Sequence, residues 1–187
     1  MFNPPRPAIN DEIVRKAAKT FTDEEFTCLP DDIEQTDSIN HLVKHYAEHK
    51  TGYELAKDLE LMEGWEIDAD TVSVLDDFDD YVWNELKVSE KEWVESNNIR
   101  PPFEIGTEVE YLFDKCWKTG VITGIYQHRP ACYTIKENGW DDEKDGHVRN
   151  VVKWEHTRKI EMCSTMNRPR KECGCPDCGS SLTEYND

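Results

Sequence analysis

The first hundred residues place apolar side chains three and four positions apart, which is the spacing of amphipathic helices. Asn10 and Asp11 can cap a first helix, whose apolar stripe comprises Ile13, Val14, Ala17, Ala18 and Phe21. Ser38 can cap a second helix, whose stripe comprises Ile39, Leu42, Val43, Tyr46 and Ala47. A third helix is expected over residues 53–63, with Gly64 ending it.

A longer helical pattern begins at Asp68 or Asp70 and has one apolar face, formed by Val72, Leu75, Val82 and Leu86. Two pairs of residues have the spacing of a capping box: Thr22 with Glu25, and Ser89 with Glu92. We expect Pro30 to stop the helix that follows the first pair, and the chain to bend at the second. These patterns predict a small helical domain over residues 1–99.

Arg100, Pro101 and Pro102 mark a domain boundary, because neither proline fits inside a helix. After this boundary the spacing of apolar residues changes from about 3.6 to about 2. Beyond this linker, alternation with a period of two predicts strands over residues 108–113, 120–126, 131–136 and 148–154. Short strands at this spacing favour a small antiparallel barrel. The expected fold class is therefore α+β: an acidic helical domain (1–99), a proline linker (100–102), a β-barrel (103–161) and a cysteine-rich tail (162–187).

Composition narrows the class of protein. The chain has 187 residues, a net charge of −18 and 37% hydrophobic residues, which is too many for a wholly disordered chain. No apolar run approaches the ~20 residues that span a membrane. The first residues lack the apolar core of a secretion signal, so we expect a cytoplasmic protein.

The charge is concentrated in the N-terminal half. Residues 1–99 carry 25 Asp/Glu and 9 Lys/Arg, whereas residues 100–187 carry 15 and 13. The first half should repel nucleic acids and anionic membranes, so we expect it not to bind DNA directly. Its candidate partner-binding residues are Asp68, Asp70, Asp76, Asp77, Asp79 and Asp80. The alternative is that this acidity only confers solubility.

Carboxylates on helices can approximate the charge of DNA. Duplex DNA carries about one charge per 1.7 Å of axis, and a helix rises about 1.5 Å per residue. From Asp31 to Asp80, the sequence resembles in composition the acidic helical DNA mimics of phages and plasmids, which occupy clefts of restriction and other defence enzymes. The whole chain is similar in plan to early accessory proteins of tailed phages. This resemblance implies a non-enzymatic inhibitor or adaptor that binds a host protein with a basic nucleic-acid-binding cleft, in the cytoplasm of a host bacterium.

The C-terminal half has the motifs of a different protein class. Gly106 precedes a first strand, Trp117 and Gly120 begin a second, and an aromatic residue, Tyr133, lies in a third. Residues 103–160 thus resemble SH3-like barrels of the Tudor and chromo-like type. The resemblance implies an aromatic cage for a cationic side chain, and the candidate rings are Tyr111, Trp117, Tyr126, Tyr133 and Trp140. The open alternatives are that these rings fill the core, or that the barrel is the main interaction module and reads a peptide or nucleic acid.

The cysteines suggest zinc. Cys175 and Cys178, separated by Pro-Asp, resemble one knuckle of a zinc ribbon. A second such pair is missing, and the remaining candidate ligands are Cys163, Cys173 and His156. The alternatives are a reduced tail without metal and a zinc site shared between chains.

Catalytic motifs are missing from the sequence. It has no glycine-rich phosphate loop, nucleophile elbow or paired-histidine metal motif, so we expect a binding protein and not an enzyme. His41, His45 and His49 are spaced to share one helix face, which could bind metal or respond to pH. Only Glu48 supplies a carboxylate nearby on that helix, which favours a solvated face.

Overall fold

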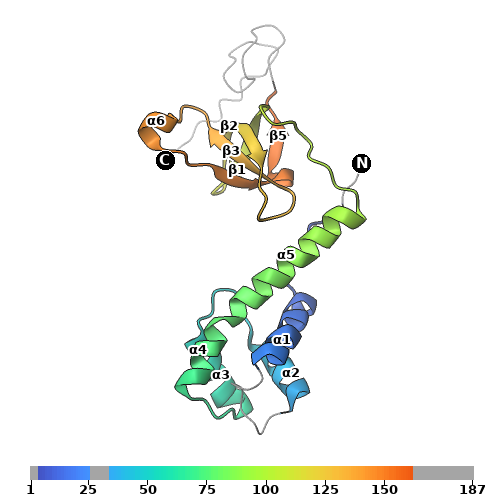
Figure 1. The fold of residues 1–187 in the computed structure, drawn as a ribbon, viewed down its shortest axis with the longest axis vertical. Helices are drawn as coiled ribbons and strands as arrows, with labels where there is room; N and C mark the ends of the chain where they lie inside the picture. Colours follow the sequence, from blue (N-terminus) through green and yellow to red (C-terminus); the bar gives the residue numbers. More distant parts are fainter. Residues whose placement is uncertain (1–3, 26–33, 162–187) are drawn as a thin grey trace, which may run out of the picture. The chain divides into compact units, whose positions relative to one another are not determined.

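The structure is a computed structural model that describes residues 4–25 and 34–161. The fold is α+β. It divides into two compact units, Met1–Ile99 and Arg100–Asp187. Figure 1 shows helices in the first unit and a curled sheet in the second.

In the first unit, residues 4–25 and 34–99 form five helices: α1 (Asp11–Glu25), α2 (Gln35–His45), α3 (Gly52–Glu63), α4 (Ala69–Asp76) and α5 (Phe78–Ser96). Their apolar stripes meet in one core, in which Phe21 of α1 packs against Phe78 of α5 with ring centroids 5.1 Å apart. Leu42 of α2 and Leu59 of α3 are fully buried in the same core. This burial, more than helix propensity, stabilises short helices of this kind.

Local hydrogen bonds determine several helix ends. The side chain of Asn10 accepts from the backbone N–H of Ile13 (3.0 Å) and begins α1. Thr51 and Glu54 form a reciprocal capping box at the start of α3. Gly64, with φ 73°, ends α3 in the left-handed conformation that glycine adopts readily.

Three expected helix starts are wrong. Ser38 is buried inside α2, which begins at Gln35 after the N-cap residue Glu34. Thr22 lies inside α1, where its hydroxyl donates to the carbonyl of Lys19 (3.1 Å). No helix begins at Ser89, which lies inside α5, and that helix continues without a break to Ser96. Capping-box spacing is also frequent inside helices, where burial of the neighbouring residues overrides it.

The helix expected from Asp68 onward is divided into α4 and α5 at Asp77. Asp68 does cap α4, because its carboxylate accepts from the backbone N–H of Thr71 (2.7 Å). The break lets both helices turn their apolar faces to one core, and it leaves four aspartates around the joint: Asp76, Asp77, Asp79 and Asp80.

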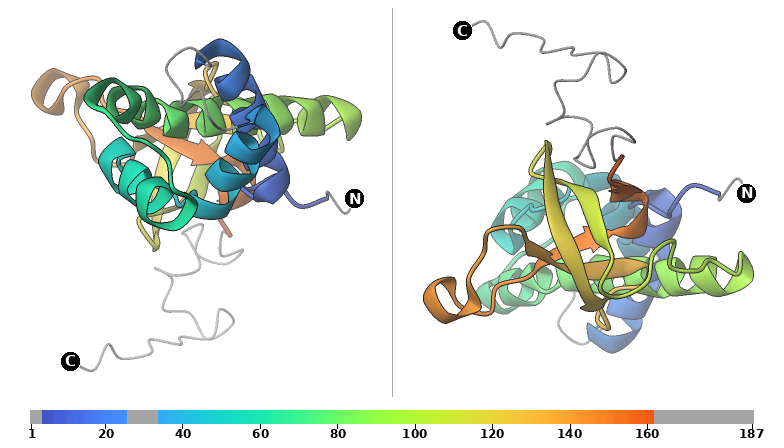
Figure 2. Two further views of the ribbon diagram at one scale, coloured as in Figure 1. Left: turned by 90° about the horizontal axis from the view of Figure 1, so that it is seen from below. Right: turned by 90° about the horizontal axis from the view of Figure 1, so that it is seen from above.

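The described residues of the second unit, 100–161, form an antiparallel five-stranded sheet with strand order β4-β3-β2-β1-β5. Its elements are β1 (Glu108–Phe113), β2 (Cys116–Ile125), β3 (Cys132–Glu137), α6 (Asp142–Asp145), β4 (Asn150–Lys153), the 3-10 helix η2 (Trp154–His156) and β5 (Thr157–Lys159). Figure 2 shows that the strands curl instead of lying flat. Asp114 and Lys115, with φ 48° and 63°, form the tight turn between β1 and β2.

Two strand predictions needed correction. β2 begins at Cys116, four residues before the expected start, because the tight turn pairs Cys116 directly with Phe113. The strand expected over residues 148–154 is limited to β4 (Asn150–Lys153), and β5 was not predicted. β5 has three residues and is held by pairing with β1, a contact that leaves no periodic pattern in the sequence.

Among the described residues, no helix is both long and apolar enough to cross a lipid bilayer.

Candidate functional site

One stretch of the first unit contains acidic residues and no basic ones. Between Lys57 and Lys87 the sequence has eleven Asp/Glu and no Lys or Arg. This stretch comprises the end of α3, all of α4 and the first half of α5. We define the acidic surface as the six predicted residues on α4, on α5 and beside them: Asp68, Asp70, Asp76, Asp77, Asp79 and Asp80.

Three residues of the acidic surface also hold the fold together. Asp68 accepts from both the N–H and the hydroxyl of Thr71 (2.7 and 2.8 Å), and the N–H bond is the main reason that the pKa of Asp68 is lowered. Asp76 accepts from the N–H of Gly52 (2.5 Å), which joins the end of α4 to the start of α3. A Cβ atom at position 52 would overlap the backbone nitrogen of Asp76. The helices therefore approach there as closely as glycine permits.

Asp79 is the third of these residues. Its carboxylate accepts from the hydroxyl of Tyr46 (2.7 Å) and from the indole N–H of Trp83 (3.1 Å). Burial of Tyr46, followed by this hydrogen bond to a carboxylate, raises the pKa of the phenol above its ordinary value of 10.0. Asp79 thereby connects α5 to the end of α2.

The other three are Asp70, Asp77 and Asp80, which are exposed, as Asp68 and Asp76 also are. Across residues 4–25 and 34–161 none of them has an ion-pair partner. Unpaired carboxylates in water keep their full charge and act on a partner at a distance set by the ionic strength. Asp70, Asp77 and Asp80 thus differ from Asp68, Asp76 and Asp79, whose carboxylates accept hydrogen bonds from other residues of the unit.

A second group of carboxylates comes from the end of α1. Tyr81 of α5 donates its hydroxyl to Glu24 (2.7 Å) and also contacts Glu25 (3.4 Å). The hydrogen bond to Glu24 is the largest cause of a raised pKa for the Tyr81 phenol. The tyrosine thus brings the acidic end of α1 next to the first turns of α5, which sequence spacing alone could not reveal.

The candidate aromatic residues of the second unit are separated by the sheet. Tyr111 and Tyr133 are completely buried, and the hydroxyl of Tyr133 donates to the carbonyl of Phe103 (2.8 Å). Trp117 is 42% exposed and lies opposite Leu112, the strand neighbour of Tyr111, so its side chain projects from the other face of the sheet.

The exposed ring of Trp117 already has a cation over it. The guanidinium of Arg158 lies 3.8 Å from the ring centroid, and its Nε donates to Glu110 (2.6 Å). Arg158 thus occupies, within the chain, the position that a cationic ligand would take over this ring.

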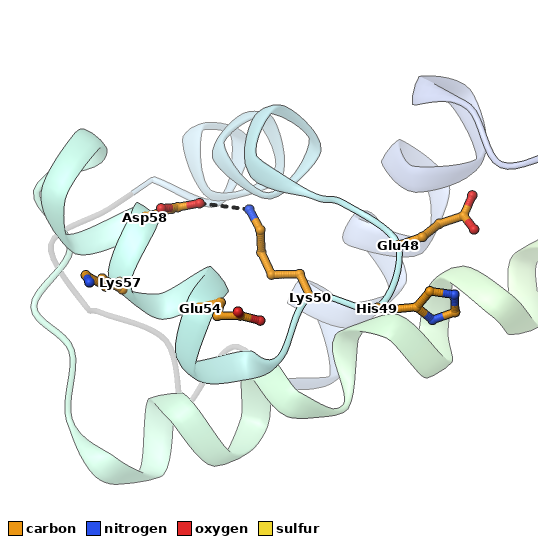
Figure 3. A pocket seen from close by; sticks show the side chains of 6 residues that line it. All are labelled: Glu48, His49, Lys50, Glu54, Lys57 and Asp58. Carbon is orange, nitrogen blue, oxygen red and sulfur yellow. Dashed lines mark hydrogen bonds and ion pairs between the residues drawn. The ribbon is translucent and has the colours of Figure 1, made fainter.

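An open pocket that the sequence did not suggest lies between the loop after α2 and the start of α3. It is lined by Glu48, His49, Lys50, Glu54, Lys57 and Asp58. Figure 3 shows Lys50 extended toward Asp58, to which its ammonium donates (2.8 Å), and His49 directed away from both. This ion pair lowers the pKa of Asp58. Lys50 also donates to the carbonyl of His45 (2.5 Å), so its charge is used to hold the loop.

The histidines contact a carboxylate from another helix. His41 and His45 of α2 direct Nε2 at Glu63, the last residue of α3, at 3.2 and 2.6 Å. Lys44 lies 2.7 Å from the same carboxylate. Hydrogen bonds from His45 and then Lys44 lower the pKa of Glu63 to about 2. We expected His49 to share one helix face with His41 and His45. This is wrong, because α2 ends at His45 and His49 has a φ of 65°.

The proposed zinc ligands Cys163, Cys173, Cys175 and Cys178 lie outside the described residues. Within the described ranges, no group of three or more His, Cys, Asp or Glu side chains is arranged to hold a metal ion. The two cysteines described there, Cys116 and Cys132, are free thiols.

No protein-family model matches the chain, and neither does a curated protein or a solved structure.

Proposed function

We propose that this protein is a non-enzymatic inhibitor or adaptor of the phage type, which binds a host protein complex through the acidic surface. The partner presents a basic nucleic-acid-binding cleft, as a nucleic-acid-acting defence enzyme does. The observation that carries the proposal is the set of exposed carboxylates of Asp70, Asp77 and Asp80, which have no ion-pair partner in the described part of the chain.

Electrostatics favours this partner class. The stretch between Lys57 and Lys87 offers no cation to neutralise these charges from within. A surface of one sign attracts a cleft of the opposite sign before contact, and this speeds association and makes it sensitive to salt. The same charge repels nucleic acid, so the protein competes with DNA for the cleft and does not bind DNA itself.

The test is recovery of partners from lysate of the host bacterium. The triple variant Asp70→Asn, Asp77→Asn, Asp80→Asn removes three charges that make no ion pair within the described residues. A matched control, Asp37→Asn, Glu92→Gln, Glu95→Gln, removes three exposed charges elsewhere on the same unit. We expect the wild type and the control to recover the same nucleic-acid-binding proteins. Added duplex DNA or raised salt should release these proteins from both. Recovery of that set by the triple variant at the same salt would contradict the proposal.

The second candidate is an interaction module formed by the sheet. The order β4-β3-β2-β1-β5, with a 3-10 helix between β4 and β5, supports assignment to the SH3-like barrels. Exposed Trp117 and Val151, each 42% accessible, offer apolar area for a peptide or a nucleic-acid base. Under this alternative, Trp117→Ala abolishes partner recovery and the triple aspartate variant does not.

A further inference from the structure

The start of the chain is bound to the second half of α5 by side-chain contacts. Arg6 lies 3.3 Å from Glu90, with the two side chains 6% and 0% exposed. The Arg6 guanidinium also lies 5.2 Å from the ring centroid of Trp93. The indole N–H of Trp93 donates to the carbonyl of Pro4 (3.2 Å).

These contacts have the chemistry of arginine recognition. A carboxylate as buried as that of Glu90 is strongly unfavourable unless a cation and hydrogen bonds accompany it. A guanidinium meets this need better than an ammonium, because it is weakly hydrated and stacks on aromatic faces. Trp93 supplies such a face and, through its N–H, a donor for the peptide backbone.

The bound segment has the form of a peptide ligand. Residues 4–10 form neither helix nor strand, and Pro4, Pro5 and Pro7 surround Arg6. Prolines restrict the backbone to an extended conformation, so little entropy is lost on binding. Ile9 packs on the core of the unit and fixes the far end of the segment.

We propose that Glu90 and Trp93 form an arginine-binding site that residues 4–9 occupy within the chain, and that a proline-flanked arginine of a basic partner protein takes the same site when those residues leave it. The chain's own segment demonstrates the fit of the sequence Pro-Pro-Arg-Pro. The net negative charge of residues 1–99 attracts a cationic segment from outside. This site is separate from the acidic surface, so its test does not depend on the proposed function.

The test uses the full-length Arg6→Ala variant, in which the chain's own segment no longer supplies the guanidinium. Two peptides are added: residues 4–10, and the sequence Gly-Ser-Pro-Pro-Arg-Pro-Gly-Ser. Matched controls carry alanine in place of arginine, or the same residues in scrambled order. Tryptophan fluorescence and calorimetry measure binding.

We expect both arginine peptides to bind the variant at one site per chain, and to bind wild type at least about tenfold more weakly, because the attached segment competes. The alanine peptide should not bind. Trp93→Phe in the Arg6→Ala background should weaken both arginine peptides, because it removes the N–H that bonds the peptide carbonyl. If Arg6→Ala unfolds the first unit, the same peptides should restore its helical circular dichroism.

Several outcomes would overturn the proposal. Equal binding of the arginine, alanine and scrambled peptides would indicate general attraction to an acidic unit. Binding by residues 4–10 alone would show that the segment is only part of the fold. A wild-type dimer that the peptides dissociate would identify the occupant as a second copy of this chain. Failure of both arginine peptides to bind or to restore folding would exclude the site.

Discussion

The indole N–H of Trp65 donates to Nδ1 of His41 across 3.0 Å, and this hydrogen bond determines which ring nitrogen carries the proton. Tryptophan can only donate, so Nδ1 must be an unprotonated acceptor. The proton of neutral His41 is therefore on Nε2, which lies 3.2 Å from the carboxylate of Glu63. A metal ion on Nε2 would require a proton on Nδ1, which the indole N–H opposes.

Replacing His41 should destabilise the first unit. Trp65 is 2% exposed, and His41→Phe leaves its N–H without the acceptor at Nδ1. We expect a loss of about 1–3 kcal/mol in the free energy of unfolding, measured by urea titration of helical circular dichroism. The control is His49→Asn, at an exposed residue with positive φ that asparagine tolerates. Equal urea midpoints for the two variants would contradict the importance of this bond.

Glu63 should make stability depend on pH in the acid range. Its pKa is lowered in the folded state from 4.5 to about 2. The folded protein thus binds the proton less readily than the unfolded chain, so the stabilisation is complete above pH 4.5 and is lost as the pH falls toward 2. In Glu63→Gln, urea midpoints should fall less steeply over this range. Glu60→Gln, an exposed change on the same helix, should keep the wild-type slope.

The aspartates around the joint of α4 and α5 should divide into two groups by stability. Asp76→Ala and Asp79→Ala each leave former donors without an acceptor, namely Gly52 N–H in the first case and Tyr46 O–H in the second. We expect each to cost about 1–3 kcal/mol. Asp77→Asn and Asp80→Asn should stay within about 0.5 kcal/mol of wild type. Thermal unfolding distinguishes the groups, and a uniform effect would reject the division.

Tyr46 and Tyr81 should ionise at unusually high pH. Burial and Asp79 raise the pKa of Tyr46, and the hydrogen bond to Glu24 raises that of Tyr81, both above 10.0. The folded state favours the neutral phenols, so their stabilising contribution is present below pH 10.0 and is lost at higher pH. Titration by tyrosinate absorbance should show that Glu24→Gln lowers one of the late transitions. Glu12→Gln, at the other end of α1, should leave them unchanged.

The cysteine-rich tail should be tested for zinc directly. If Cys163, Cys173, Cys175 and Cys178 form the site that the sequence suggests, purified protein should contain about one zinc per chain. Cys178→Ser should release it, whereas the exposed thiol change Cys116→Ser should not. Elemental analysis measures the metal. Metal-free wild type purified without chelators would leave the interpretation of a reduced tail.

Local signals predicted part of the fold, because some structure depends on near neighbours. Asn10 and Asp68 cap helices through residues three positions away, and Gly64 ends one by its own conformational freedom. The same local rules failed at Ser38 and Ser89, because burial of neighbouring residues determines where those helices begin and continue.

The contacts at the candidate sites were harder to predict. Glu63 meets His41 across two helices, and Arg158 covers Trp117 from another strand. Such pairs depend on how elements pack, and a single sequence contains no record of that packing. The acidic run itself could be read from composition. Only the structure distinguishes the carboxylates of this run that make no ion pair from those that hold helices together.

The contact between Gly52 and Asp76 also limits how this sequence can evolve. Any side chain at position 52 would overlap the backbone of α4, whatever residue stands at position 76. Position 76 is less restricted, because asparagine offers the same acceptor to the N–H of Gly52. Drift can therefore remove the charge at position 76 while the glycine stays, so the acidity of the joint can be lost by single substitutions without loss of the fold.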